Sequence, residues 1–150
     1  MPTPNYSSFI SGVVTRLKES NDLNSIADEQ IYYGPNVPQI VEWPAVTVEL
    51  NEVQEEWRTF GGTKHGQKDA LCSIVIGVYD KAFDYMSGLN SVEDKVRQVE
   101  NVLRSDTGVS GNFYFSETTT KRFAEVEFNN TPVFSAEIVL NGKIRFTQAG

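Results

Sequence analysis

The single histidine of the chain, His65, is the first candidate for acid–base chemistry. It lies in a glycine-rich stretch, and no nucleophile motif of the form G-x-S-x-G accompanies it. A general base must reach the proton that it abstracts, directly or through one water. We therefore expect His65 to be a solvated or partner-contacting residue, and we predict that the chain is not an enzyme.

The segment from Gly61 to Gly66 is the second candidate, because glycine-rich loops can cradle phosphate groups. Its sequence, Gly-Gly-Thr-Lys-His-Gly, lacks the G-x-x-x-x-G-K-[ST] spacing of a phosphate loop. It also leads into a predicted strand, whereas a phosphate loop leads into a helix. We expect a mobile hairpin tip over residues 60–69, where glycines permit unusual backbone angles.

Metal or cofactor binding has little support in the sequence. One cysteine and one histidine cannot supply a zinc set, and Cys72 lies on an apolar face of a predicted strand, where we expect a small core residue. A divalent ion between Asp80 and Asp84 is conceivable, but the spacing of an EF-hand does not follow. We expect no cofactor and no metal.

Aromatic residues near loops favour contact with another protein. Trp57 beside a mobile loop fits an interface anchor as well as it fits a core residue, and the sequence leaves both readings open. The candidate partner-contact loop comprises Trp57, Phe60, Gly61, Gly62, Lys64, His65 and Lys68.

Composition narrows the class of protein further. Thirteen basic and twenty acidic residues give a net charge of −7, so we expect no specific grip on nucleic acid, which requires clustered lysine and arginine. No apolar run approaches the length of a membrane span. The first residues have no basic stretch followed by an apolar core, so we expect no secretory signal. The single cysteine excludes an internal disulfide and fits a reducing compartment.

Two amphipathic helices are predicted, one over residues 6–19 and one over residues 91–104. Ser7 or Ser8 is expected to cap the first helix, and Ser91 with Asp94 resembles a capping box for the second. Their apolar stripes are Phe9, Ile10, Val13, Val14 and Leu17 in the first, and Val92, Val96, Val99, Val102 and Leu103 in the second.

Strands account for most of the remaining chain. Residues 45–50 alternate and continue, past a bulge, toward Trp57, and residues 70–79 are apolar on both faces, which predicts a central strand covered on both sides. Short strands are expected at residues 30–33 and 112–115, and others at 122–128 and 134–140. Asn141-Gly142 then signals a hairpin before a last strand at 143–146.

The order of these elements is helix, strands, helix, strands. It predicts an α+β fold with a mainly antiparallel sheet and two principal amphipathic helices packed on one face. The length of 150 residues fits a single domain spanning 1–150.

This layout resembles the phage tail terminator family, also described as tail completion or minor tail proteins. The shared features are the helix from Phe9 to Leu17, the stretch Tyr33-Gly34-Pro35-Asn36-Val37-Pro38 leading to Pro44-Ala45-Val46-Thr47-Val48, the strand from Asp69 to Asp80 after a glycine-rich loop, and the helix from Val92 to Leu103 followed by strands. Together these features run through most of the chain.

The resemblance implies a structural subunit of a hexameric ring that caps the tail tube, ends its polymerisation and presents a surface for head attachment. Its implied partners are further copies of the chain, the tail tube protein and the head–tail connector protein. The implied location is the virion tail or neck, after assembly in the host cytoplasm. The alternatives are a head–tail connector or neck component, a monomeric binding module, and a small enzyme using His65 or the Asp80/Asp84 region.

Overall fold

The computed structural model describes the chain except residues 1–5, 21–22, 24–25, 27, 35–42, 60–64, 82–83, 106–114, 129–130 and 150, and at several strand ends it describes the backbone alone. The elements in chain order are α1 (Ser7–Glu19), the 3-10 helix η1 (Asp28–Gln30), β1 (Ile31–Tyr33), β2 (Ala45–Thr59), β3 (His65–Lys81), α2 (Tyr85–Arg104), β4 (Phe115–Phe128) and β5 (Thr131–Ala149).

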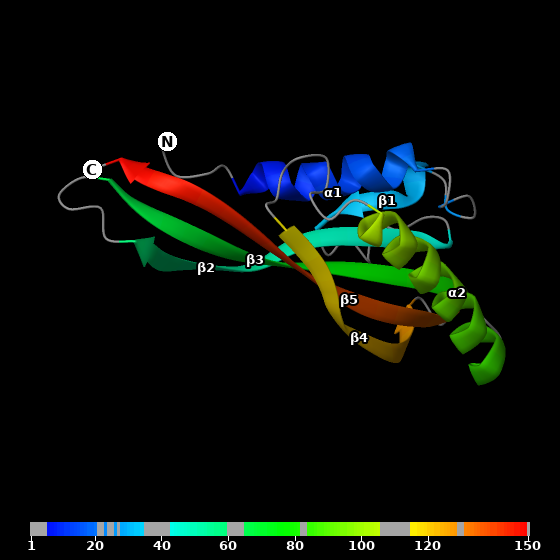
Figure 1. Ribbon diagram of the computed structural model, residues 1–150. Coiled ribbons are helices and arrows are strands. Elements are labelled where there is room, and N and C mark those ends of the chain that lie inside the picture. Colours follow the sequence, from blue (N-terminus) through cyan, green and yellow to red (C-terminus); the bar gives the residue numbers. More distant parts are fainter. Residues whose placement is uncertain are drawn as a thin grey trace.

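One twisted sheet organises these elements, with the strand order β1-β2-β3-β5-β4 (Figure 1). β1 runs parallel to β2, and the other three neighbouring pairs are antiparallel. The predicted α+β fold with a mainly antiparallel sheet is therefore confirmed.

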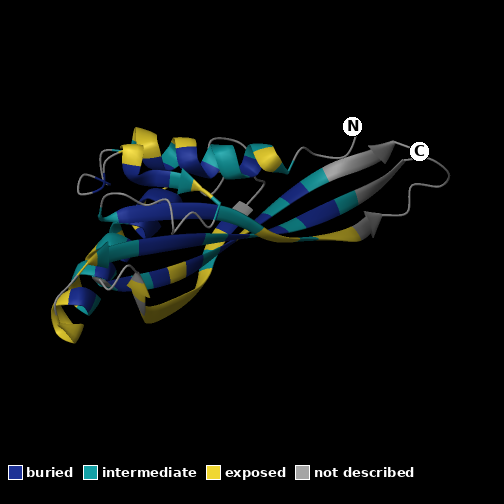
Figure 2. Ribbon diagram, turned by 180° about the vertical axis from the view of Figure 1, so that it is seen from behind, coloured by how far each residue is buried: buried dark blue, intermediate teal, exposed yellow. Residues whose placement is uncertain are grey.

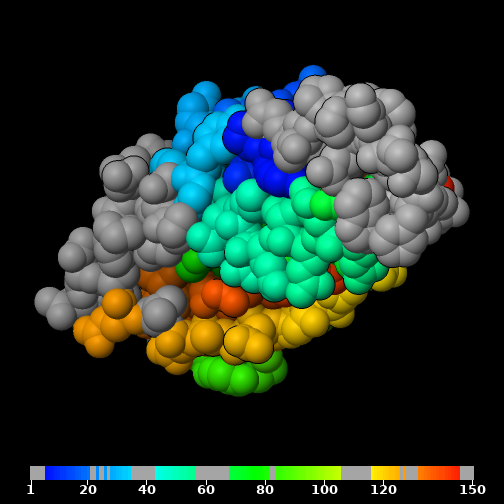
Figure 3. Space-filling view, turned by 90° about the vertical axis from the view of Figure 1, so that its left-hand side faces the viewer, coloured from blue at the N-terminus to red at the C-terminus, as the bar shows by residue number. Residues whose placement is uncertain are grey.

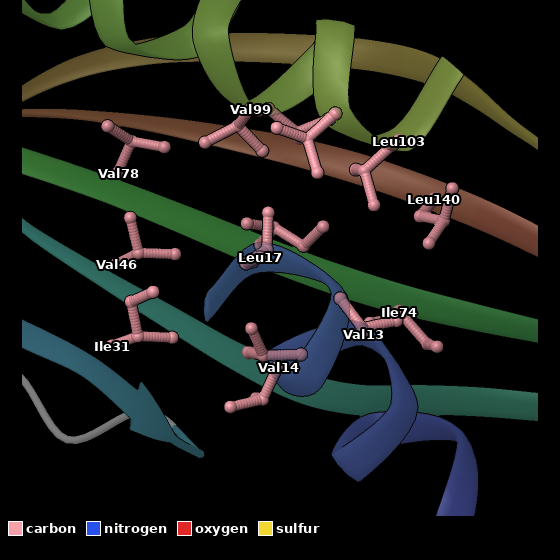
Figure 4. Packing of buried hydrophobic residues seen from close by; sticks show 14 of the residues in the cluster. Val13, Val14, Leu17, Ile31, Val46, Ile74, Val78, Val99, Leu103 and Leu140 are labelled. Carbon is pink, nitrogen blue, oxygen red and sulfur yellow. The ribbon is translucent and has the colours of Figure 1, made fainter. Parts of the chain in front are cut away.

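Both helices pack on the same face of the sheet, as the two apolar stripes predicted. Val13 and Leu17 of α1 meet Val99 of α2 in one buried cluster, which also takes in strand residues such as Ile74 and Leu140 (Figure 4). The stripe residues of both helices are almost completely buried, apart from Ile10. Valine is a weak helix former, so burial against the sheet stabilises α2 more than intrinsic propensity does.

The central position of β3 is also confirmed, but its two faces differ. Cys72, Ile74 and Ile76 point toward the helices and are no more than 1% exposed. Leu71 and Val75 alternate with these residues along the strand, so they point to the opposite face, and they are half-buried. The prediction that this strand is covered on both sides is wrong, because α1 and α2 share one face of the sheet and the residues of the other face stay partly exposed.

The starts of both helices differ from the predictions. No side chain caps the N-terminus of α1, so neither serine at its start has the predicted role. α2 begins six residues earlier than predicted, with Asp84 as its N-cap, and the Asp84 side chain accepts from the backbone N–H of Ser87. Ser91 lies inside α2, where its hydroxyl donates to Asp80, so the predicted capping box is wrong.

The predicted hairpin at Asn141-Gly142 is wrong as well. β5 continues through both residues: Gly142 pairs with Cys72 of β3 on one side and with Ser116 of β4 on the other. Pairing on both sides fixes an extended backbone and overrides the local turn preference. The hairpin between β4 and β5 lies earlier, where Phe128 pairs with Thr131.

Two further strand assignments change. β4 is one strand from Phe115 to Phe128, with an irregularity between Thr118 and Lys121, instead of two short strands. Residues 112–114 of the first predicted strand lie outside the described residues. The short strand predicted at 30–33 is confirmed at Ile31–Tyr33.

Candidate functional site

Three strands continue past the part of the sheet that the helices cover and form an arm (Figure 1). We define the arm as residues 54–59 of β2, 65–71 of β3 and 143–149 of β5. β3 is its middle strand, because Glu56 pairs with Asp69 and Asp69 pairs with Arg145. The predicted continuation of β2 past a bulge is confirmed, with the register shift between Leu50 and Glu52.

The arm reaches past the hydrophobic core. On β2, Gln54, Glu55 and Glu56 are all exposed, although consecutive residues of a strand point to opposite faces (Figure 2). Both faces of β2 are therefore exposed to solvent at these three residues. Polar contacts between neighbouring strands must therefore provide much of the stabilising free energy that buried apolar side chains provide in the rest of the sheet.

A buried carboxylate, Asp69, organises one face of the arm. Its Oδ1 accepts from Nε of Arg145 at 3.0 Å, and its Oδ2 lies 3.3 Å from Nζ of Lys143. Burial alone would raise the pKa of Asp69, but the hydrogen bonds and positive charges of Arg145 and Lys143 outweigh it and lower the pKa. Asp69 is therefore a charged group that ties β3 to β5.

The other face of the arm is tied to α1. The hydroxyl of Tyr6, just before the helix, donates to Oε1 of Glu55 at 2.5 Å, and Nζ of Lys68 lies 3.4 Å from Oε2 of the same carboxylate. Burial and the hydrogen bond to Glu55 raise the pKa of Tyr6 to about 12. Tyr6 therefore stays a neutral donor at physiological pH, and it holds the base of the arm against α1.

Three residues of the predicted contact loop, Trp57, His65 and Lys68, lie in the strands of the arm. Trp57 lies in β2 and pairs with Lys68 of β3, and His65 pairs with Ala149 of β5. The prediction of a loop over residues 65–69 is wrong, because ladders on both sides hold these residues in β3. Phe60, Gly61, Gly62 and Lys64 lie outside the described residues.

Two strand edges of the arm have no neighbour within the described part of the chain. β1 ends its pairing with β2 at Val48, so residues 49–59 of β2 form an edge. β4 ends its pairing with β5 at Lys143, so residues 144–149 form the opposite edge. Figure 3, seen from the arm side, shows β2 as a broad band at the surface.

The candidates for metal and acid chemistry have structural roles. Asp80 accepts from Ser91 and lies 3.1 Å from Nζ of Lys95, which fixes α2 to the end of β3. Asp84 caps α2, and Cys72 is a buried core residue whose pKa is raised to about 11 by burial. Among the described residues, no group of three or more metal-binding side chains gathers, and no helix is long and apolar enough to cross a membrane.

A small apolar hollow lies at the far end of the molecule from the arm. It has a volume of about 50 Å³ and lies between the first turns of α2 and strands β4 and β5, with Tyr85, Leu89 and Phe123 in its wall. Tyr85 is 63% exposed and Phe123 is 43% exposed. Solvent-exposed aromatic side chains beside a hollow are typical of protein contact sites.

The sequence reasoning missed the cluster around Asp69 and the contact of Tyr6 with Glu55. The spacing of Lys143 and Arg145 does indicate one face of a strand, because they are two residues apart. Their partner Asp69 is 76 residues from Arg145 along the chain, and only the sheet register brings the two together.

Comparison with known proteins yields likenesses in structure alone. No family model matches the chain, and no curated protein matches it. Among solved structures, the fold is similar to a chain of the virion of a native gene transfer agent particle, with a TM-score of 0.52 and 13% sequence identity. The match covers 91% of this chain and 93% of that chain. At this identity, the likeness establishes a shared fold.

Proposed function

We propose that this chain is a structural subunit of a phage-type virion. The observation that carries the proposal is the fold shared with a virion protein over 91% of this chain and 93% of that one. Because the two chains correspond almost end to end, we propose that residues 1–150 act as one unit. Acting as a building block is also consistent with charged side chains that serve as caps and cross-links, such as Asp84 and Asp69.

Within that class, we propose a ring subunit at the end of the tail tube. Six copies would form the ring, cap the tube, stop further tube subunits from adding and present a surface to the head connector. The shape of the molecule supports this role, because the arm and the apolar hollow beside Tyr85 lie at opposite ends and offer two different contact surfaces (Figure 1). The ring itself needs a further, heterologous contact between neighbouring copies.

Electron microscopy of particles made without this protein tests the role. A ring that ends the tube predicts overlong tails, and adding the protein back should restore the normal length. Tails of normal length that remain detached from heads would instead assign a head–tail connector or neck role, which the same fold also suits. Normal particles in its absence would contradict both roles.

We also propose that the hairpin connection at the arm tip contacts the tail tube. This proposal keeps Trp57, Phe60, Gly61, Gly62, Lys64, His65 and Lys68 as candidates. The structure assigns residues up to Thr59 to β2 and residues from His65 to β3, so the test replaces residues 60–64 alone. Replacing residues 60–64 with a Gly-Ser linker of equal length should preserve the circular dichroism spectrum of the fold. Binding to purified tail tubes should weaken, and unchanged binding would contradict the proposal.

A further inference from the structure

We propose that β5 of one subunit pairs, in the arm, with β2 of the next subunit, so that the sheets of neighbouring copies continue into one another. The partner is a second copy of this chain, held through backbone hydrogen bonds between residues 144–149 of β5 and the edge of β2. This inference rests on the proposed ring and specifies how its subunits join.

The open edges are the first observation behind this inference. A strand edge exposes a row of N–H and C=O groups that can pair with another chain. Within the described residues, β5 has such an edge over residues 144–149 and β2 over residues 49–59. The two edges lie on opposite sides of the same three-stranded arm, so one copy can offer both at once.

The third long edge of the sheet provides a contrast. β4 has an irregularity between Thr118 and Lys121, and its exposed residues include Glu117, Arg122 and Glu125. A bulge and charges of both signs are the devices that protect an edge against pairing. The edge of β5 has a regular register from residue 144 to 149 and one charged residue, Arg145. The β5 edge lacks that protection. The β2 edge has register shifts between Leu50 and Glu52 and between Trp57 and Thr59, and its exposed charged residues among those described, Glu52, Glu55 and Glu56, are all acidic, so it opposes pairing with another β2 edge but suits the edge that carries Arg145.

Strand direction fits a closed ring. β2 and β5 both run antiparallel to β3, so they run parallel to each other, and both run toward the arm tip. When copies stand side by side with their arms pointing the same way, rotational symmetry brings β5 of each copy beside β2 of the next. The resulting ladder is parallel, with evenly spaced, slanted hydrogen bonds.

Charge complementarity sets the register. Glu56, Asp69 and Arg145 form one row across the arm, with the acidic residue at the β2 edge and the basic residue at the β5 edge. If neighbouring copies pair without an offset along the strand direction, Arg145 of one copy lies beside Glu56 of the next. Opposite charges in directly neighbouring strands stabilise pairing, and like charges there oppose it. Two β2 edges would bring the acidic residues Glu52, Glu55 and Glu56 of both copies together, so the head-to-tail arrangement is favoured.

Hydrogen exchange of the full-length protein tests the pairing directly. Native mass spectrometry first defines concentrations at which the chain is monomeric or assembled. We expect amides within 144–149 and 52–57 to exchange at least about tenfold more slowly in the assembled state, because edge N–H groups gain partners. Protection that appears only elsewhere on an assembled ring would overturn the edge pairing and leave the ring itself intact.

A charge change at the edge gives a second readout. Glu56→Lys should weaken each subunit contact by about fivefold to tenfold, since attraction to Arg145 becomes repulsion. The fold should persist, because the new lysine neighbours Asp69 within its own subunit. Glu117→Lys on β4 is the matched control, with the same change of charge, and should assemble like the unmodified chain.

The outcomes separate the two proposals. Normal assembly of Glu56→Lys, measured by sedimentation velocity, would overturn the edge pairing while a ring remains. Absence of any ring, both in solution and on purified tail tubes, would overturn the ring and the edge pairing together.

Discussion

Gly88→Ala is the substitution whose outcome the packing defines most sharply. Gly88 is buried in the first turn of α2, where the helix crosses Phe134 of β5. A Cβ atom at position 88 would lie 2.1 Å from Cδ2 and 2.3 Å from Cε2 of the Phe134 ring. Ordinary contacts between carbon atoms are about 3.5–4.0 Å, so the ring or the helix must move by more than about 1 Å.

Two opposing effects decide whether Gly88→Ala raises or lowers the free energy of unfolding. Replacing glycine by alanine inside a helix stabilises by about 1 kcal/mol through propensity. Overpacking a core typically costs about 1–3 kcal/mol and more when the overlap is severe. Phe134 lines the small hollow beside Tyr85 but is only 5% exposed, and the overlap is severe, so we take the upper end of that range. We expect a net loss of about 2 kcal/mol, which lowers Tm by about 4–8 °C in a domain of this size.

Urea unfolding at a concentration where the chain is monomeric measures this loss, because assembly would add stability of its own. Asn90→Ala is the control, an exposed position two residues further along α2 that should be neutral or slightly stabilised. Gly88→Ala combined with Phe134→Leu should recover at least about 1 kcal/mol relative to the sum of the single changes. A Gly88→Ala protein as stable as the unmodified chain would refute the packing argument.

Three further predictions concern buried polar groups. Asp69→Asn should lower the free energy of unfolding by about 1–3 kcal/mol at pH 7. Breaking a fully buried ion pair would cost more, but here Lys143 and Arg145 are both partly exposed. The lowered pKa of Asp69 means that its contribution is present above about pH 4 and is lost below it, so urea melts of the two proteins should converge toward pH 2. Glu100→Ala should cost about 1–2 kcal/mol in the same melts, since this buried carboxylate joins α2 to β4 through Lys121 at 3.0 Å. Cys72, with its pKa near 11, should react with iodoacetamide at pH 8 at least about a hundredfold more slowly in the folded chain than in urea.

Periodicity predicted the parts of the fold in which one pattern repeats over many residues. The helical stripe from Val92 to Leu103 and the apolar run from residue 70 to 79 each extend over several turns or residue pairs, and α2 and β3 include the residues where they were expected. The start of α2 was missed because Ser87 and Gly88 interrupt the apolar pattern. Gly88 is there for its small size against Phe134, a reason that only the packing reveals.

Turn signals failed where strand pairing contradicts them. Asn141 and Gly142 together favour a two-residue turn when they are isolated. In the protein, both residues have partners in β3 and in β4, and a turn there would break two ladders at once. His65 and Gly66 were assigned to a loop for the same local reason, and pairing with Ala149 and Gln148 holds them in a strand. Partners so distant along the chain leave no local trace in the sequence.

The arm connects the stability of the fold to its proposed function. A strand extension with little apolar cover gains little from the hydrophobic effect, and each residue that it orders costs conformational entropy. In this arm, that cost is offset by pairing within the sheet and by the ties of Asp69 and Glu55. Neither carboxylate extends the hydrophobic core: Asp69 links β3 to β5, and Glu55 links β2 to β3 and to the start of α1. An arm ordered in this way before assembly would present its two edges at a fixed spacing, which lowers the entropy lost when the next copy binds.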